Sequence, residues 1–323
     1  MSAVTDTKRG DLWFRIRLNL RAVIGRSYPR IIGANREPSW ILFEAILPLL
    51  GIAAYVFIYK FFADQAILAI LGGQCGDHAC TSASEQAAYV VQAKANLNAL
   101  VATVILGGTM VAFWLNVLWS MASQLYWEKE IGNLQLYMMA PMSRMALLGG
   151  MAVGGMVMTS VRALTTLAVG LFVFGVILAV VNPAMLLAVF FVTLIALYGM
   201  GMMFASLYLL WGREAWNLSA LMEEPIFLSS GFYFPAGGFT RIAGWGPYLL
   251  AAAAAVPATL GLDAMRQLVT PGAWGGRLWI LSVDLELAIL VVLAVGFLIL
   301  ARYSLAYLEF LAKREGRLTS RHQ

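Results

Sequence analysis

The sequence predicts an all-α integral membrane protein with six transmembrane helices, an N-terminal amphipathic interfacial helix, a short cytoplasmic helix and an outer re-entrant helical hairpin. Of its 323 residues, 61% are hydrophobic and only 12% are charged, whereas soluble globular proteins carry about 25% charged residues. Several apolar stretches reach the roughly 20 residues that a helix needs to cross a bilayer core. Positive charge also gathers at both ends of the chain, a pattern that marks the cytoplasmic side of a membrane.

Both ends are therefore expected inside the cell, which requires an even number of crossings. The net charge of +5 comes largely from these flanks, so it indicates topology rather than binding of nucleic acid. The basic N-terminal region is too long for the start of a cleaved signal peptide. The basic residues before the first apolar stretch and after the last are Lys8, Arg9, Arg15, Arg17, Arg21, Arg26, Arg30 and Arg36, and Lys313, Arg314, Arg317 and Arg321.

Five crossings are expected from uninterrupted apolar stretches, at residues 39–59, 97–121, 152–176, 185–209 and 280–303. A sixth, at 215–234, is interrupted by Glu223, Glu224 and Pro225. It is counted because six crossings keep both ends inside. The segments expected outside are 60–96, a turn near Asn182-Pro183, and 235–279, and those expected inside are 122–150 and 210–214.

Three regions follow from this topology. Residues 1–38 form a cytoplasmic N-terminus, 39–307 a six-helix transmembrane domain, and 308–323 a basic cytoplasmic tail. Within 11–32, apolar residues recur at helical spacing between arginines, which favours a helix lying on the cytoplasmic leaflet. The alternative is a solvated helix packed against a soluble domain.

The outer segment 235–279 holds four prolines and few polar residues, namely Pro235, Pro247, Pro257 and Pro271 among alanines, glycines and tryptophans. It is too apolar for a solvated loop and too broken by proline for a straight crossing. A hairpin that dips into the outer leaflet and is buried in protein satisfies both facts. A seventh and an eighth crossing are the alternative.

A charged passage lies between two apolar stretches at residues 126–144, YWEKEIGNLQLYMMAPMSR. It is helix-prone through Leu136, and we expect Glu128, Lys129 and Glu130 near its exposed side. Ser143, close behind Pro141, is placed to cap the next helix. This passage is either a free amphipathic turn or a knob that docks on a cytoplasmic partner.

The same passage resembles the EKE-G-L-L-P-S-R sequence that follows the second span in membrane subunits of ABC type-2 exporters, a class that exports drugs, lipids, polysaccharides and sometimes ions. LSSGFYFP at 228–235 resembles the SG-FP motif closing the fifth span of that family. AVPATLGLDAMRQLV at 255–269 is similar to the P-T-LDA-R passage of its outer hairpin. The three motifs stand in family order, and the resemblance covers nearly the whole chain.

The resemblance implies a role for each matching region. Residues 126–137 would be the coupling helix that fits a groove on a separate ATPase subunit, with Pro141, Ser143 and Arg144 leading into the third span. The outer hairpin and gate would include Gly231, Pro235, Pro257, Asp263 and Arg266. The coupling residues would be Tyr126, Trp127, Glu128, Lys129, Glu130, Gly132, Leu134, Leu136 and Tyr137.

The resemblance also implies partners and a location. No G-x-x-x-x-G-K-[ST] loop occurs in the sequence, so the chain is not expected to be an enzyme by itself. ATP and Mg would belong to two copies of the ATPase subunit. A second permease copy or a related permease would complete the path among membrane lipids, in a bacterial or archaeal plasma membrane.

Three ionisable residues fall at membrane depth, where charge costs roughly 2.5 to 3.5 kcal/mol on insertion scales and suggests function. They are Arg162, Glu223 and Glu224. We expect Arg162 to pair with one of the glutamates, either as a lock between helices or as a polar patch lining a path. The family usually has uncharged residues at the two glutamates. The alternative function is an ion-coupled secondary transporter that uses these three residues, although no inverted repeat is evident.

The two cysteines, Cys75 and Cys80, lie in the expected outer segment 60–96. A disulfide-closed loop is favoured there, because that compartment permits disulfides. Two free thiols, or a metal site with His78 and Asp77, are the alternatives, and metal is disfavoured by the shortage of ligands. No nucleophile, base and orienting group cluster by spacing. Gly150 and Gly154 permit close helix approach, or are a chance spacing among 30 glycines.

Overall fold

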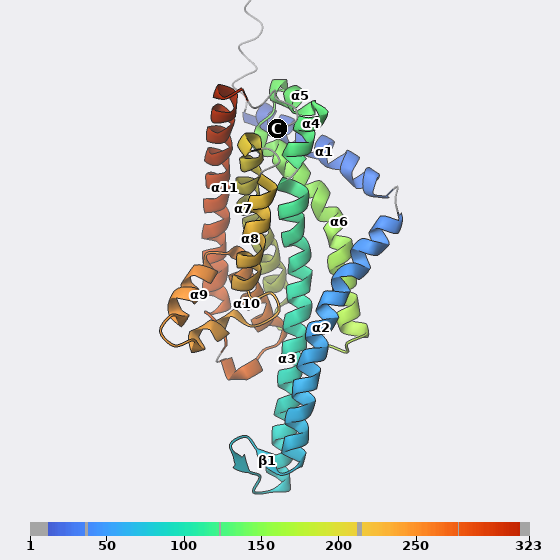
Figure 1. Cartoon of the computed structure of the whole chain (residues 1–323), viewed down its shortest axis with the longest axis vertical. Coiled ribbons are helices and arrows are strands. Elements are labelled where there is room, and N and C mark those ends of the chain that lie inside the picture. The colour runs from blue at the N-terminus through green and yellow to red at the C-terminus, as the bar shows by residue number, and fades with distance from the viewer. Residues whose placement is uncertain (1–11, 36–37, 123, 212–214, 277, 317–323) are drawn as a thin grey trace, which may run out of the picture.

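The computed structural model describes residues 12–35, 38–122, 124–211, 215–276 and 278–316. These residues form an elongated bundle of helices (Figure 1). One end carries α1, α4, α5 and the C-terminal end of α11, and the opposite end carries the strands β1 and β2. We call these the inner end and the outer end, following the topology expected from the basic flanks.

Five long helices cross most of this length. They are α2 (Pro38–Leu71), α3 (Ala83–Leu115), α6 (Arg144–Phe172), α7 (Pro183–Trp211) and α11 (Val283–Arg314). The shorter elements are α1 (Leu12–Asn35), β1 (Gln74–Cys75), β2 (His78–Ala79), η1 (Asn116–Ala122), α4 (Gln124–Ile131), α5 (Asn133–Met139), α8 (Ala215–Ser229), η3 (Ala236–Arg241), α9 (Gly246–Ala254), α10 (Pro257–Val269) and η4 (Ala273–Gly276).

The predicted fold class is confirmed. Within the described residues, five helices are long and apolar enough to cross a membrane, and the number rises to six only if the bent pair of α9 and α10 is one broken span rather than a re-entrant loop. The expected crossing at 215–234 is not among these candidates, because α8 has 15 residues and reaches only about 22 Å. α8 nevertheless carries the chain part of the way back from the inner end (Figure 1), so α1 and the end of α11 lie on the same side.

The outer hairpin consists of α9 and α10, which meet at an angle of 96°. Their 9 and 13 residues are each too few to cross a bilayer core, so the alternative of two further crossings is wrong. Most of α10 is buried. This burial satisfies the requirement that broken helices at membrane depth be enclosed by protein.

α3 is the central helix, and most of its residues from Ala99 to Trp114 are buried. The crossing expected at 97–121 is α-helical only to Leu115 and then widens into the π-helix η1. α7 and α11 pack side by side on the flank of the bundle that faces away from α2 (Figure 1). π-helical turns are rare and often occur at functional sites, and η1 faces both α6 and α7.

α1 packs across the first half of α6, and two glycines of α6 make this approach possible. A Cβ at Gly150 would lie 2.9 Å from the carbonyl oxygen of Val23, and one at Gly154 would lie 3.2 Å from that of Ser27. The Gly150–Gly154 spacing is therefore a helix contact rather than chance. The apolar residues that α1 leaves exposed fit a helix on the membrane surface; they are Trp13, Phe14, Ile16, Leu20 and Ile24.

α2 and α3 form a long hairpin that projects beyond the other helices at the outer end (Figure 1). Each has more than 30 residues and is thus about 50 Å long, well over the roughly 30 Å of a bilayer core. A two-stranded ribbon closes the tip, and the structure joins Cys75 and Cys80 by the disulfide that the sequence favoured.

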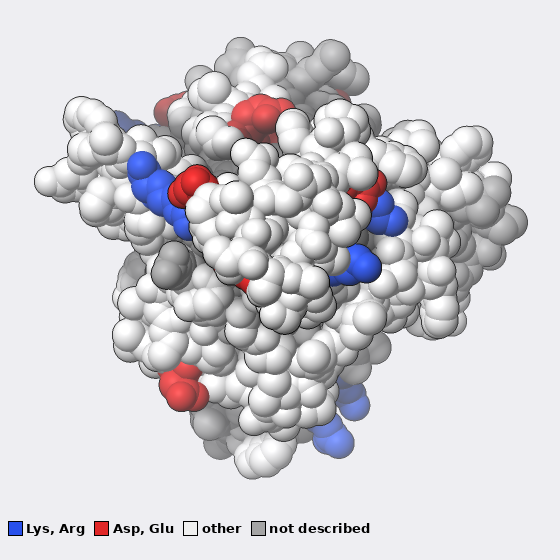
Figure 2. All heavy atoms as spheres, turned by 90° about the horizontal axis from the view of Figure 1, so that it is seen from below, with Lys and Arg blue, Asp and Glu red and all other residues white. Residues whose placement is uncertain are grey.

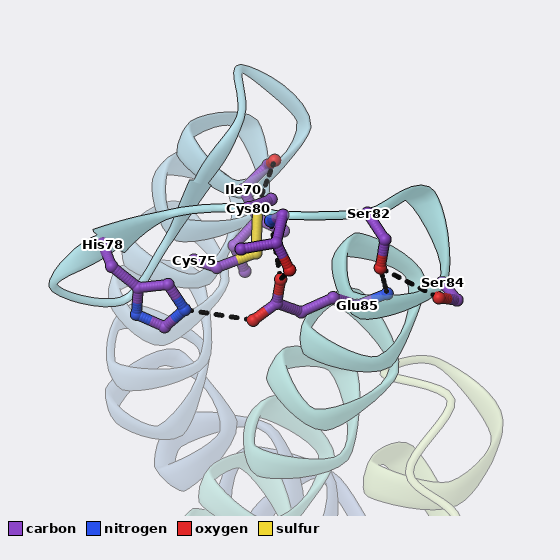
Figure 3. Close-up of polar contacts among 8 residues, drawn as sticks. Ile70, Cys75, His78, Cys80, Ser82, Ser84 and Glu85 are labelled. Atoms are coloured by element: carbon purple, nitrogen blue, oxygen red, sulfur yellow. Dashed lines mark hydrogen bonds and ion pairs between the residues drawn. A yellow bond between two sulfur atoms is a disulfide. The ribbon is translucent and has the colours of Figure 1, made fainter.

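Polar contacts order this tip (Figure 3). Ser82 caps α3 by accepting a hydrogen bond from the backbone nitrogen of Glu85. The Glu85 side chain lies 3.0 Å from the ring of His78 and 2.7 Å from the backbone nitrogen of Thr81. The His78 ring thus bonds a carboxylate of the next helix, and the described residues hold no group of three or more metal-ligand side chains.

Candidate functional site

The predicted coupling segment is a sharp corner made by α4 and α5 at the inner end (Figure 1). Gly132 separates the two helices with φ of 89°, a left-handed conformation that favours glycine. Leu125 before the corner and Leu134 after it are 3% and 2% exposed. These two leucines anchor the corner in the hydrophobic core of the bundle.

The corner is tied to α1 by Arg26. Its guanidinium donates a hydrogen bond to the side-chain oxygen of Gln124 at 2.8 Å and forms an ion pair with Glu128. Asn133 donates to the other oxygen of Glu128 at 3.1 Å. The guanidinium also lies 5.8 Å from the ring centre of Tyr137, so one arginine contacts both α4 and α5.

Glu128 and Lys129 do not lie near the exposed side, and that prediction was wrong. Each is only 7% exposed, and Glu130 is half-buried. The physical reason is Arg26, because a carboxylate can be buried where a cation and a further donor meet it. Charged groups also lie close together on α1. Burial and the neighbouring Arg26 lower the pKa of Arg30, one turn further along this helix.

The exposed face of the corner is apolar instead. Trp127, Ile131, Leu136 and Met139 are 47%, 66%, 62% and 75% exposed. We call these four exposed side chains the apolar corner. Tyr126 is half-buried, and its ring lies 5.3 Å from that of Trp127. An exposed apolar group on a short, internally tied element suits a protein contact.

Behind the corner, the start of α6 is fixed to two other helices. Ser143 caps α6 by accepting from the backbone nitrogen of Ala146 at 3.1 Å, as predicted, and its own nitrogen donates to Asn19 of α1. Arg144 forms an ion pair with Glu309 of α11, which also binds Lys313. The start of α6 is therefore connected to both α1 and α11.

The expected pairing of Arg162 with Glu223 or Glu224 stays a prediction, and the structure gives Glu223 a described partner. Glu223 accepts a hydrogen bond of 2.8 Å from the indole nitrogen of Trp119 in η1. α6 packs chiefly on α1, α2, α3 and η1, whereas α8 packs chiefly on α7, α9 and η1. Glu224 is exposed on the surface of α8.

At the outer side, Arg266 of α10 organises the end of α8. It is 1% exposed. Its Nη2 donates to the carbonyl oxygens of Gly231, Phe232 and Thr103 at 2.8, 3.0 and 3.3 Å, and its Nη1 donates to that of Phe234 at 3.2 Å. A single side chain thus serves the non-helical backbone just before Pro235.

Further contacts complete this arrangement, which we call the outer knot: residues 231–234 with Arg266, Tyr59 and Gly107. The Tyr59 hydroxyl donates to the carbonyl oxygen of Tyr233 at 2.7 Å. A Cβ at Gly107 of α3 would lie 1.5 Å from the carbonyl oxygen of Phe232. All four carbonyls of 231–234 are therefore bonded, as backbone at membrane depth requires.

The remaining outer residues hold the hairpin in shape. Pro257 begins α10 directly after the bend. Asp263 is fully buried and accepts from the backbone nitrogen of Ile280 at 2.9 Å and from Gln267 at 3.0 Å. Glu286 is also fully buried and accepts from the backbone nitrogen of Leu281 at 3.2 Å. These bonds join α10 to the segment that leads into α11.

Sequence reasoning named Arg266 and Glu128 but missed the residues that hold them. Arg26 was counted only as a positive flank, and Trp119, Tyr59 and Glu309 were not singled out. Arg26 and Glu309 gave one signal that sequence reasoning could have used. Each is a charged residue that lies at least one helical turn away from the end of its helix. Nothing in a single sequence indicates which distant helix such a charge meets.

No protein-family model and no curated protein matches this chain. The structure itself supports a multi-pass helical membrane protein with a tied apolar corner at one end and a buried, re-entrant hairpin toward the other.

Proposed function

We propose that this chain is the membrane-spanning subunit of an ATP-binding-cassette exporter of the type-2 class, coupled to a separate ATPase subunit through residues 126–137. The apolar corner is the observation that carries this proposal. An exposed set of large apolar side chains on a surface expected in the cytoplasm calls for a protein partner. The three motif resemblances supply the kind of partner.

The mechanism that follows is mechanical. Two ATPase copies, which hold ATP and Mg, close on nucleotide and push on the apolar corner. Arg26 and Glu128 pass the motion to α1, and Arg144 and Glu309 pass it to α6 and α11. A transporter needs two states with different substrate affinity, and this set of ties lets a soluble motor bias them.

The substrate path is proposed to form between this chain and a second permease copy or a related chain. Glu224 supports this, because an exposed carboxylate on α8 is costly against lipid and favoured against a wet path or a partner. The rival ion-coupled transporter depended on Arg162, Glu223 and Glu224 acting together. Because Glu223 is engaged by the indole nitrogen of Trp119, we favour the exporter.

The expected location is a bacterial or archaeal plasma membrane with both ends in the cytoplasm. The distribution of charge supports this orientation. Figure 2 views the molecule from the outer end, where a few separate charged side chains interrupt a mainly uncharged surface. The basic residues of α1 and of the last turn of α11 gather at the other end, as cytoplasmic segments do.

The test is co-purification of the full chain with the ATPase subunit encoded nearest to it. Leu136→Ser is compared with Phe310→Ser, because these side chains are 62% and 63% exposed at the same end but only Leu136 belongs to the apolar corner. We expect Leu136→Ser to lose most of the bound ATPase and the ATPase stimulation by substrate, with an unchanged Tm. Equal ATPase retention in both variants contradicts the proposal.

A further inference from the structure

A pocket of about 880 Å³ lies at the inner end, between α1, the connection from α5 to α6, and α11. It is separate from the apolar corner, although Tyr137 and Pro141 contribute to its wall. Its floor and rim come from three segments that are far apart in sequence. The residues that matter for its chemistry are Phe14, Arg15, Leu18, Arg144, Arg302 and Leu305.

The pocket is positively charged. Arg15 of α1, Arg144 of α6 and Arg302 of α11 line it, and no lining residue is acidic. Arg144 is neutralised by Glu309, which lies outside the lining. Arg15 and Arg302 are exposed, and neither forms an ion pair within the described part of the chain. Two guanidinium groups thus converge on one pocket without a carboxylate, which favours a phosphate-bearing ligand.

Apolar side chains also line the pocket. Phe14 is 49% exposed, and Leu18, Met145 and Leu305 complete this wall. A free phosphate makes no favourable contact with these apolar side chains, whereas a phospholipid carries acyl chains close to its phosphate. The combination therefore selects an amphiphile with an anionic head group.

The pocket also lies at the right depth. Tyr303 and Tyr307 of α11, next to Arg302 and Leu305, are 69% and 65% exposed. Exposed tyrosines mark the level of lipid head groups. Basic pockets between helices on the cytoplasmic side are known positions for anionic lipid head groups.

We propose that this pocket binds one anionic phospholipid of the inner leaflet, with the phosphate between Arg15 and Arg302 and an acyl chain along Phe14, Leu18 and Leu305. The lipid bridges α1 to α11. The proposal rests on the pocket and the membrane placement alone and does not depend on the proposed export function.

The test uses the full chain in nanodiscs of phosphatidylcholine with increasing phosphatidylglycerol, followed by native mass spectrometry that counts retained lipids. We expect one phosphatidylglycerol per chain to bind saturably. Each of Arg15→Gln and Arg302→Gln should weaken it about fivefold and the double variant about 25-fold, at roughly the contribution of one basic residue near an anionic surface. Arg21→Gln is the matched control, because Arg21 is exposed on the same helix but does not line the pocket.

Three results overturn the proposal. Equal retention of phosphatidylglycerol and phosphatidylcholine removes the anion preference. Displacement of the lipid by millimolar inorganic phosphate assigns the pocket to a free anion instead. Loss of the co-purified ATPase subunit in the double variant, with lipid retention unchanged, makes the pocket a protein-docking surface. Thermal unfolding of each variant establishes that the fold is intact, and Arg15→Lys with Arg302→Lys should restore part of the lipid binding.

Discussion

The inner and outer ends of this molecule both hold separate segments together, but they do so with different kinds of bond. At the inner end, Arg26 and Glu128 tie separate helices through side chain to side chain bonds. At the outer knot, Arg266 bonds backbone carbonyls, and Gly107 lets two backbones touch. A side-chain tie can break and re-form at modest cost, whereas bonds to backbone at membrane depth have no replacement partner. The comparison indicates a movable inner end and a rigid outer end.

Removing Arg266 should have the largest effect. Arg266→Leu leaves the carbonyls of Gly231, Phe232 and Phe234 without their donor, and unmet buried groups cost about 1 to 3 kcal/mol each. We expect a loss of about 4 kcal/mol or failure to fold, measured as Tm by fluorescence-detected size exclusion. Arg241→Leu, at an exposed position on the same side, should leave the Tm unchanged. Equal Tm values for the two variants would show that the outer knot is not rigid.

The second-largest effect on stability is expected at Gly107. Gly107→Ala places a methyl group against the carbonyl of Phe232, and backbone cannot swing aside as a side chain can. Overpacking usually costs about 1 to 3 kcal/mol, and we expect the upper end here. Gly296→Ala on α11, where nothing lies within 4 Å of the new Cβ, is the control for helix propensity. A Tm for Gly107→Ala at or above that of the control contradicts the close approach.

Breaking the Arg26–Glu128 pair should lower the stability less than these two changes do. It should lower the substrate-stimulated ATPase activity more. Arg26→Gln and Glu128→Gln should each lower stability by about 2 kcal/mol, because the pair is partly exposed and breaking a fully buried pair costs about 3 to 5 kcal/mol. The double variant should lose less than the sum, since neither charge is then left alone. Tm and substrate-stimulated ATPase activity are measured together. Strict additivity of the two single changes would remove the tie from the mechanism.

The disulfide should have the smallest effect on the body of the molecule. Opening a loop as short as that between Cys75 and Cys80 costs about 2 kcal/mol in the chain-entropy model. This cost falls on the tip alone, because local units open independently. Cys75→Ser with Cys80→Ser should speed hydrogen exchange in residues 72–82 and leave the Tm of the bundle nearly constant. A large Tm shift would mean that the tip and the bundle unfold together.

The sequence predicted the helical membrane class, the re-entrant hairpin and the cap at Ser143, because each depends on local composition, proline or a neighbouring residue. It did not predict the burial of Glu128, whose partner Arg26 is 102 positions away. It also did not predict that Glu223 accepts a hydrogen bond from Trp119. On helices apolar all round, periodicity does not tell a face against protein from a face against lipid, and η1 has no local signature.

The length of the α2–α3 hairpin has a practical consequence. Because these two helices are roughly 20 Å longer than a bilayer core is thick, we expect the closed ribbon at their tip to lie beyond the hydrocarbon region, on the outer surface of the proposed topology. A binder raised against residues 72–82 would reach its epitope in whole cells without permeabilisation. Such a reagent could lock or report the conformation of the assembled protein from the side opposite the proposed ATPase subunit.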